Sequence, residues 1–110
     1  AVVIQGAATV TEAIEAYNLG VDLIKIYPVN FLGEAAYVKR LRRSFPFLKL
    51  VPSGGVTLDN FLDYLKVGAT ACAIGRSLCD KALIRAHQWP EMTERAKQFT
   101  QKLESLKIAR

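Results

Sequence analysis

Histidine and cysteine are scarce in this chain of 110 residues. His87 is the only histidine, and without an obvious partner it is expected to lie on the surface rather than to act as a catalyst. The two cysteines, Cys72 and Cys79, are too few and wrongly spaced for a zinc site. Cys72 lies in an apolar stretch and is expected to pack as a small core residue. We therefore expect no bound metal, and the cysteine content fits a reducing cytoplasm.

Long hydrophobic runs are also absent. No stretch of 18 apolar residues occurs, so a membrane-spanning helix is not expected. The chain begins inside the apolar stretch AVVIQG with neither an initiator methionine nor a positively charged leader, which differs from a signal peptide. Such a start is expected where a sequence has been cut from a longer one.

Acidic residues are outnumbered by basic ones, 10 to 15, which gives a net charge of +5. The positive charges are spread along the chain, with one local cluster in residues 39–43. No aromatic or nucleic-acid-binding motif accompanies this cluster, so we interpret it as a solvated helix face and expect no nucleic-acid partner. A mildly basic enzyme of ordinary globular composition would suit an anionic substrate.

What the chain does contain is a repeat. Gly6 aligns with Gly54 and Gly20 aligns with Gly68, each pair 48 residues apart. Each copy predicts a strand, a glycine turn, a helix, a glycine that ends the helix, and another strand.

Local signals place the two helices of this repeat. Thr9 and Glu12 have the spacing of a capping box, in which the hydroxyl and the carboxylate accept hydrogen bonds from free N–H groups at the helix start. Thr57 has the corresponding position in the second copy. Apolar side chains recur at helical spacing and form the expected inward faces: Val10, Ala13, Ile14 and Tyr17 in the first copy, and Leu58, Phe61, Leu62 and Leu65 in the second.

Two further helices and a strand are predicted. The segment GEAAYVKRLRRSF predicts an amphipathic helix, and LKLVP after it predicts a strand. The last helix is expected from about Pro90 to Lys107, after a short segment around residues 80–85. The expected inward residues of the two helices are Ala36, Val38, Leu41 and Phe45, and Met92, Ala96, Phe99 and Leu103.

The predicted order of elements is β-α-β-α-β-α-β-α. Short apolar strands that alternate with helices predict a parallel sheet covered by helices. With right-handed crossovers, the sheet could be open or could form part of a (β/α)8 TIM barrel, of which four β/α units make one half. We expect residues 1–110 to form one domain.

A lysine stands within one of these strands. In DLIKIYP, residues 22–28, successive side chains alternate, so Lys25 shares a face with Leu23 and Tyr27. It aligns with Ala73 in the second copy, which indicates that packing does not require a lysine there. Burial disfavours the charged ammonium, and a neutral amine attacks carbonyl groups to form Schiff bases. The alternative is a lysine that extends from the strand end into water.

Glycine turns follow the next two strands. VPSGGVT places residues 53–55 at the end of a strand and directly before a helix, and AIGRSL places residues 75–77 at the end of the next strand. Glycines let a backbone approach a ligand closely, and free N–H groups at a helix start attract phosphate. Loops after neighbouring strands of a barrel often share a phosphate site. Two ordinary tight turns are the alternative.

Together these motifs resemble a known family. GAATVTEAIEAYNLGVDLIKIYP, VPSGGVT, AIGRSL and the terminal CDKALIRAHQWPEMTERAKQF are similar to the C-terminal half of the 2-keto-3-deoxy-6-phosphogluconate / 4-hydroxy-2-oxoglutarate aldolases. The most specific element is the lysine two residues before an aromatic–proline pair, followed by the two glycines. The resemblance implies that this chain supplies the last four β/α units of a (β/α)8 barrel and a C-terminal helix.

The resemblance also implies a class I aldolase. Such an enzyme cleaves a 2-keto-4-hydroxy acid, for example 2-keto-3-deoxy-6-phosphogluconate, to pyruvate and an aldehyde through a Schiff base, without a metal or organic cofactor. Lys25 would form the Schiff base, and Tyr27 and Pro28 would shape the wall beside the pyruvate. The residues of the two turns would hold the substrate phosphate: Ser53, Gly54, Gly55, Gly75, Arg76 and Ser77.

Several positions depart from the family pattern. Val29 and Asn30 stand where the family usually has alanine and glutamate, and Ser53 replaces a threonine but keeps the hydroxyl. Arg76 replaces a glycine, and its side chain could clamp a phosphate or point to solvent. No residue matches the family's general acid/base glutamate or the arginine that grips the substrate carboxylate, since both lie in the first four β/α units.

Two other interpretations stay open. The chain could be a non-catalytic half-barrel that dimerises, aggregates or belongs to a longer polypeptide, because its sheet would have two open edges. It could also be a phosphate-binding barrel enzyme without Schiff-base chemistry, similar to thiamine-phosphate synthases, although the lysine argues against this. The aldolase resemblance implies a keto-acid ligand and a homo-oligomer such as a trimer. The cytoplasmic location is expected from the cysteine content, and no membrane partner is expected because no long apolar run occurs.

Overall fold

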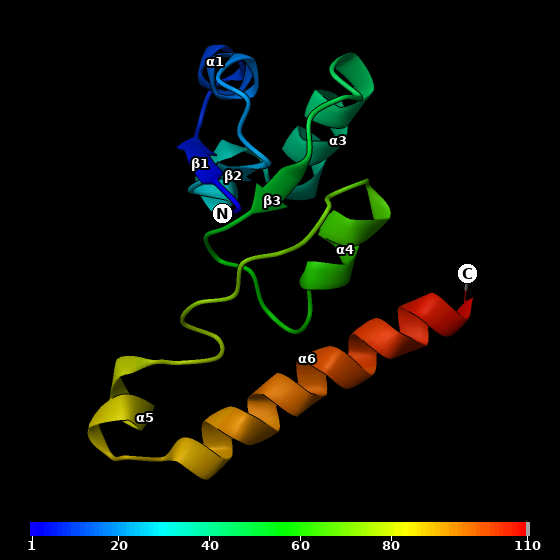
Figure 1. Cartoon of the computed structure of the whole chain (residues 1–110). Coiled ribbons are helices and arrows are strands. Elements are labelled where there is room, and N and C mark those ends of the chain that lie inside the picture. The colour runs from blue at the N-terminus through cyan, green and yellow to red at the C-terminus, as the bar shows by residue number, and fades with distance from the viewer. Residues whose placement is uncertain (110) are drawn as a thin grey trace.

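The computed structural model describes residues 1–109, and the side chains of residues 1–107. The strands are β1 (Ile4–Ala7), β2 (Leu23–Ile26) and β3 (Leu50–Pro52). The helices are α1 (Val10–Asn18), α2 (Val29–Leu32), α3 (Glu34–Ser44), α4 (Phe61–Lys66), α5 (Lys81–Arg85) and α6 (Trp89–Ala109). Figure 1 shows the sheet with α1 to α4 as one layered part, from which an extended segment leads to α5 and α6.

The three strands form one parallel sheet in the order β1-β2-β3. Lys25 of β2 is aligned with Gly6 of β1 on one side and with Val51 of β3 on the other. Helix α1 connects β1 to β2, and α2 and α3 connect β2 to β3. The predicted α/β fold with a parallel sheet is confirmed, and its completion to a barrel stays a prediction.

The expected fourth strand does not form. Residues 70–74 run beside β3, with two backbone hydrogen bonds to it: Thr70 N donates to Leu50 O at 2.8 Å, and Ala73 N donates to Pro52 O at 3.0 Å. Within residues 1–109 no strand lies on their other side, so they lack the second ladder that a central strand has. The sheet therefore has two open edges, one at β1 and one beyond β3.

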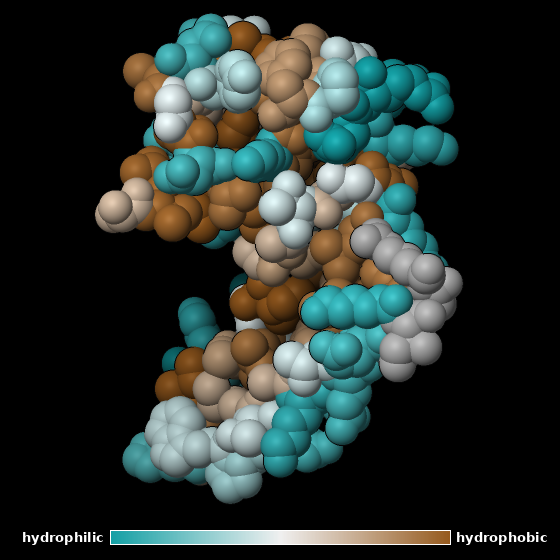
Figure 2. All heavy atoms as spheres, turned by 45° about the vertical axis from the view of Figure 1, so that its right-hand side comes forward, coloured by the Kyte–Doolittle hydropathy of each residue, from teal (hydrophilic) through white to brown (hydrophobic). Residues whose placement is uncertain are grey.

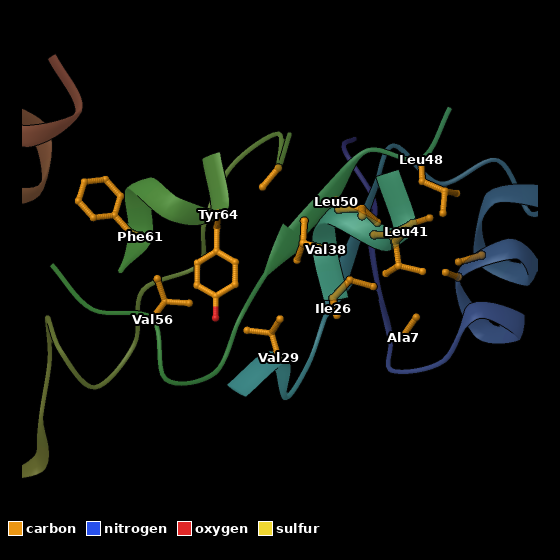
Figure 3. Close-up of a cluster of buried hydrophobic side chains, with 14 residues drawn as sticks. Ala7, Ile26, Val29, Val38, Leu41, Leu48, Leu50, Val56, Phe61 and Tyr64 are labelled. Atoms are coloured by element: carbon orange, nitrogen blue, oxygen red, sulfur yellow. The ribbon is translucent and has the colours of Figure 1, made fainter. Parts of the chain in front are cut away.

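The hydrophobic core lies on the helix-covered face of the sheet. Ile26 of β2 and Leu50 of β3 are fully buried, and Figure 3 shows them beside Val38 and Leu41 of α3. Side chains alternate along a strand, so Lys25 lies on the opposite face, where it is half-buried. The alternation predicted for this strand is confirmed.

The helix signals of the repeat hold for α1 and are shifted for α4. Glu12 N donates to Thr9 Oγ1 at 3.2 Å, and Thr9 N donates to a Glu12 carboxylate oxygen at 3.0 Å, which completes the predicted capping box. Thr57 and Asn60 instead exchange hydrogen bonds in a turn, and α4 begins at Phe61. Thr57 accepts from Asn60 N through its hydroxyl and from Phe61 N through its carbonyl, so it caps this helix start as predicted, with a turn over residues 58–60 before α4.

The inward faces of two helices differ from the expected ones. Ala36 of α3 is exposed, and Ala35 packs against the core in its place. In α1, Tyr17 is 45% exposed, whereas Ala13 and Ala16 are buried. One residue turns a helix by about 100°, so an error of one position in the inferred register moves a side chain from the core to the surface.

Helix α6 packs against α4 with one row of apolar side chains and lies apart from the sheet (Figure 1). The Phe99 ring meets the Phe61 ring of α4 edge-on, with 5.1 Å between the centroids. The predicted inward residues are half-buried rather than fully buried: Met92, Ala96, Phe99 and Leu103. None of the helices described in the structure is both long and apolar enough to cross a membrane.

Candidate active site

The turns after β2, after β3 and after residues 70–74 meet at the carboxyl end of the sheet. They border an open pocket of about 850 Å³. Figure 2 shows the indentation between the part of the molecule that carries the sheet and the part that carries α5 and α6. Eight residues predicted to bind substrate line this pocket: Tyr27, Pro28, Ser53, Gly54, Gly55, Gly75, Arg76 and Ser77. The structure brings these residues together, and their role in binding stays a prediction.

The first glycine turn packs tightly on the turn after β2. Gly54 has φ +101° and Gly55 has φ +66°, a left-handed conformation that favours glycine. A Cβ at Gly54 would lie 2.8 Å from Asn30 Oδ1, and one at Gly55 would lie 2.8 Å from Asn30 Cβ. Both glycines are therefore required by backbone conformation and by space. Asn30 was expected only as a departure from the family pattern, and the structure places it in the pocket wall.

The second glycine turn is tied to the first. Leu78 N and Cys79 N donate to Gly75 O at 3.0 and 2.9 Å, which closes the turn. The Ser77 hydroxyl donates to Val56 O at 2.7 Å, and Val56 directly follows the two glycines of the first turn. The two turns thus form one connected wall rather than two separate loops.

Backbone N–H groups of both turns are unused. Within the described part of the chain, no acceptor receives a hydrogen bond from the amides of Gly54, Gly55, Gly75, Arg76 or Ser77. Clusters of successive unpaired N–H groups in turns attract anions. The side chain of Arg76 is exposed at the same pocket, and it adds a positive charge there. The geometry therefore suits a phosphate or a similar anion.

Lys25 lies near this pocket without lining it. Its Nζ is 5.9 Å from the centroid of the Tyr27 ring, and Tyr27 is one of the lining residues. Lys25 is half-buried, which is intermediate between the buried amine and the water-exposed lysine that the sequence left open. Gly6 of β1 is the residue paired with Lys25. A Cβ added to Gly6 would meet nothing within 4 Å, so open space adjoins the lysine.

Asp80 is a pocket residue that the sequence did not indicate. It caps α5 by accepting a hydrogen bond from Leu83 N at 2.8 Å, and one carboxylate oxygen lies 3.2 Å from Arg95 Nη1. The backbone N–H of Leu83, and after it the guanidinium of Arg95, hold the pKa of Asp80 below its usual value. The pocket therefore has one acidic side chain on its rim, and that side chain is paired.

The two cysteines do not add chemistry to this site. Burial raises the pKa of the Cys72 thiol to about 11, as expected for a core residue that is not a nucleophile. Cys79 is exposed and free. Among residues 1–109, histidines, cysteines and acidic side chains form no group that could hold a metal ion.

Comparison with known proteins identifies the family. A family model described as KDPG and KHG aldolase matches residues 1–95. The chain belongs to the KDPG and KHG aldolases. A curated relative, the 2-dehydro-3-deoxy-phosphogluconate aldolase of Pseudomonas aeruginosa, is 32% identical over 87 residues, which cover 79% of this chain and 40% of that protein.

Two solved structures share the fold of this chain. The native KDPGal structure superposes with a TM-score of 0.82 at 28% identity, over 94% of this chain and 48% of that one. The KDPG aldolase of Legionella pneumophila, with pyruvate captured at low pH as a covalent carbinolamine intermediate, has a TM-score of 0.75 at 28% identity, over 83% of this chain and 44% of that one. This chain spans less than half of the length of these relatives.

Membership in the KDPG and KHG aldolases decides between two of the three interpretations of the sequence. It favours an aldolase over a phosphate-binding enzyme of the thiamine-phosphate synthase type. The non-catalytic half-barrel stays open, because family membership does not test the activity of a chain of this length.

Proposed function

We propose that this chain carries the Schiff-base lysine and the phosphate-binding turns of a class I aldolase. The substrate would be a 2-keto-4-hydroxy acid such as 2-keto-3-deoxy-6-phosphogluconate, and the products would be pyruvate and an aldehyde. The observation that supports this proposal is the convergence of two turns with unused N–H groups on one pocket, beside the strand that carries Lys25.

Lys25 would act as the nucleophile. Its amine attacks the keto carbon to give a carbinolamine, and loss of water gives an iminium. When the C4 hydroxyl loses its proton, the C3–C4 bond breaks, its electron pair moves into the iminium to form an enamine, and the aldehyde leaves. Protonation of the enamine at C3 and hydrolysis release pyruvate and restore the amine. A pyruvate carbinolamine in the Legionella pneumophila relative supports this sequence of steps.

The two glycine turns would hold the substrate phosphate. Their amides can each donate one hydrogen bond to a phosphate oxygen without giving up a bond inside the protein. Arg76 would add a charge-assisted hydrogen bond from the exposed side of the pocket. Tyr27, between the pocket and the lysine, would line the path of the carbon chain from the phosphate to the reacting carbonyl.

The proton acceptor for the C4 hydroxyl is not assigned to this chain, because no residue matches the family's general acid/base. We propose that residues 1–110 form the last four β/α units of a (β/α)8 barrel and that the acid/base lies in the other units. The two open sheet edges and the coverage of 48% of the native KDPGal chain support this arrangement. A homo-oligomer and a cytoplasmic location belong to the same proposal.

Trapping with pyruvate and sodium borohydride tests the function. Reduction would fix the pyruvyl group on Lys25 and block tryptic cleavage there, so the digest should contain one modified peptide spanning residues 1–39. Lys25→Arg should abolish the adduct, and Lys49→Arg should leave it unchanged, since Lys49 is exposed at the other end of the sheet. An adduct spread evenly over the surface lysines, or no adduct at all, would contradict the proposal.

The non-catalytic half-barrel is the second candidate. It is favoured by one observation: the anion pocket is lined within this chain, whereas Lys25 is half-buried and faces open space. In that case inorganic phosphate would bind with no pyruvyl adduct at Lys25. The same pair of measurements therefore separates the two functions.

A further inference from the structure

We infer that Arg95 of α6 is a positioning residue that fixes the second glycine turn and neutralises the acidic rim of the pocket for anion binding. The inference rests on the proposed phosphate site. Arg95 itself is not among the residues that line the pocket. It affects the site indirectly, through its hydrogen bonds to two lining residues, Ser77 and Asp80.

One nitrogen of Arg95 contacts both wall residues. Arg95 Nη1 donates to Ser77 O at 3.4 Å and to Asp80 Oδ2 at 3.2 Å. Its Nε donates to Glu91 Oε1 at 3.4 Å, one turn earlier in α6. The guanidinium is planar and presents its donors in a fixed fork, so these contacts set its orientation. Helix α6 is thereby attached to the turn that carries the unused amides.

Ser77 is consequently held from two sides. Its hydroxyl donates to Val56 O of the first turn, and its carbonyl accepts from Arg95. Both attachments are on Ser77, and the amides of Gly75, Arg76 and Ser77 directly precede its carbonyl in the chain. Without Arg95, the Ser77 carbonyl loses this donor, and the direction in which these amides point is less restricted. The cost appears in anion binding because a displacement of about 1 Å weakens every hydrogen bond to the ligand.

The charge of Asp80 gives Arg95 a second effect. Asp80 lines the pocket, and its carboxylate is about one-third exposed. With Arg95 beside it, the negative charge is paired at 3.2 Å. Without Arg95, an unpaired carboxylate stands on the rim of a pocket that would receive an anion, and like charges repel. Both effects of losing Arg95 therefore act in the same direction, toward weaker anion binding.

Binding of inorganic phosphate, measured by isothermal titration calorimetry, tests the inference. We expect Arg95→Gln to weaken phosphate binding roughly fivefold or more, which corresponds to the loss of about one hydrogen bond together with new repulsion. Asp80→Asn keeps a side chain that caps α5 and removes the negative charge, so in the Arg95→Gln background it should restore part of the affinity. Arg95→Lys keeps the charge and loses the fork, and it should be intermediate.

Glu91→Gln is the matched control. It removes the negative charge beside Arg95 Nε, keeps an amide oxygen that can accept from it, and leaves both Nη1 contacts in place, so phosphate affinity should stay within about twofold of the unmodified chain. Thermal unfolding checks that each variant is folded, and Arg95→Lys carries the test if Arg95→Gln does not fold.

Three outcomes would overturn the inference. Phosphate affinity could be unchanged in folded Arg95→Gln, it could fall equally in Glu91→Gln, or the unmodified chain could bind no phosphate. The pyruvyl adduct on Lys25 is scored separately. An adduct with unchanged phosphate affinity in Arg95→Gln would refute the positioning role alone, and a missing adduct would refute the aldolase proposal alone.

Discussion

Asn30 and Gly55 pack closely in the pocket wall. An added Cβ at Gly55 would meet three atoms of Asn30 within 3.1 Å, and the backbone there is left-handed. The position is therefore constrained twice, once by conformation and once by a neighbouring side chain from a different turn. These two constraints can be separated by mutation.

We predict that Gly55→Ala lowers the free energy of unfolding by roughly 2 kcal/mol or more, because it adds left-handed strain and a steric clash. In an Asn30→Gly background the clash is removed and the strain remains, so the cost of Gly55→Ala should fall by about half. Urea unfolding of the four chains measures this.

Gly6→Ala is the control for that pair. Gly6 lies in β1, and an added Cβ there meets nothing within 4 Å, so the substitution should change stability by less than about 0.5 kcal/mol. Equal effects of Gly6→Ala and Gly55→Ala, or strict additivity with Asn30→Gly, would contradict the packing described for the first glycine turn.

Single residues of the site were predictable where their chemistry is unusual for their position. A lysine inside a strand and glycines after strands are such cases, and the eight predicted binding residues do gather at one pocket. Asn30, Asp80 and Arg95 could not be predicted in this way. Each is a polar residue of a type common on protein surfaces, and no sequence motif includes it. Its role depends on its contacts with a turn or helix that is distant in the sequence.

Helix α1 owes part of its stability to its capping box, and that part depends on pH. The N–H of Thr9, then the N–H of Ala8 and the hydroxyl of Thr9, hold the pKa of Glu12 below its usual value of 4.5. A carboxyl group with a lower pKa in the folded state stabilises that state fully above the unfolded pKa. This stabilisation is lost as the pH falls below 4.5 and through the folded pKa.

We therefore predict that Glu12→Gln lowers stability near pH 7 and that its difference from the unmodified chain shrinks as the pH falls from about 5 to about 3. Urea unfolding at several pH values measures the difference. Glu15→Gln, in the same helix and outside the capping box, should show a smaller difference near pH 7. A pH-independent difference for Glu12→Gln would contradict the coupling of the cap to ionisation.

Helices and strands could be predicted from the sequence where the residues of a single segment determine them. The capping box, the alternation of β2 and the long amphipathic α6 all follow from residues within one segment. The prediction of a fourth strand failed because residues 70–74 make only two backbone hydrogen bonds to β3, and no strand of the described chain lies on their other side. Helix α4 begins at Phe61 and not directly after Thr57, because residues 58–60 first form a turn in which Thr57 and Asn60 exchange hydrogen bonds.

For the molecule as a whole, the open edges of the sheet are the feature that most favours association with other chains. At β1, Val3 is 48% exposed and Ile4 is 52% exposed. Unpaired edge strands with apolar side chains pair with other chains, and a lysine at the edge opposes this. Three parallel strands alone leave these edges uncovered, as expected for part of a larger sheet or barrel.

We predict that the isolated chain associates as its concentration rises and that Ile4→Lys reduces this association. Sedimentation velocity over a range of protein concentrations measures it. Leu19→Lys is the control, because Leu19 is 79% exposed at the end of α1 and does not belong to an edge strand. A chain that sediments as a monomer at every concentration, or an equal effect of both lysines, would contradict the prediction.

The hydrogen bond between the Ser77 hydroxyl and Val56 O has a further consequence for any ligand of the pocket. A serine hydroxyl has a single proton to donate, and here a carbonyl of the neighbouring turn already receives it. A ligand oxygen that recruits this proton would exchange one bond for another, and in doing so it would uncouple the two loops. A hydrogen bond from the hydroxyl to a ligand thus changes the binding free energy very little. A hydrogen bond from one of the unused backbone N–H groups makes binding more favourable, because no bond inside the protein is lost. Selectivity at this wall should accordingly come from the backbone, and side-chain replacements at this serine should change affinity through loop mobility and not through loss of a direct contact.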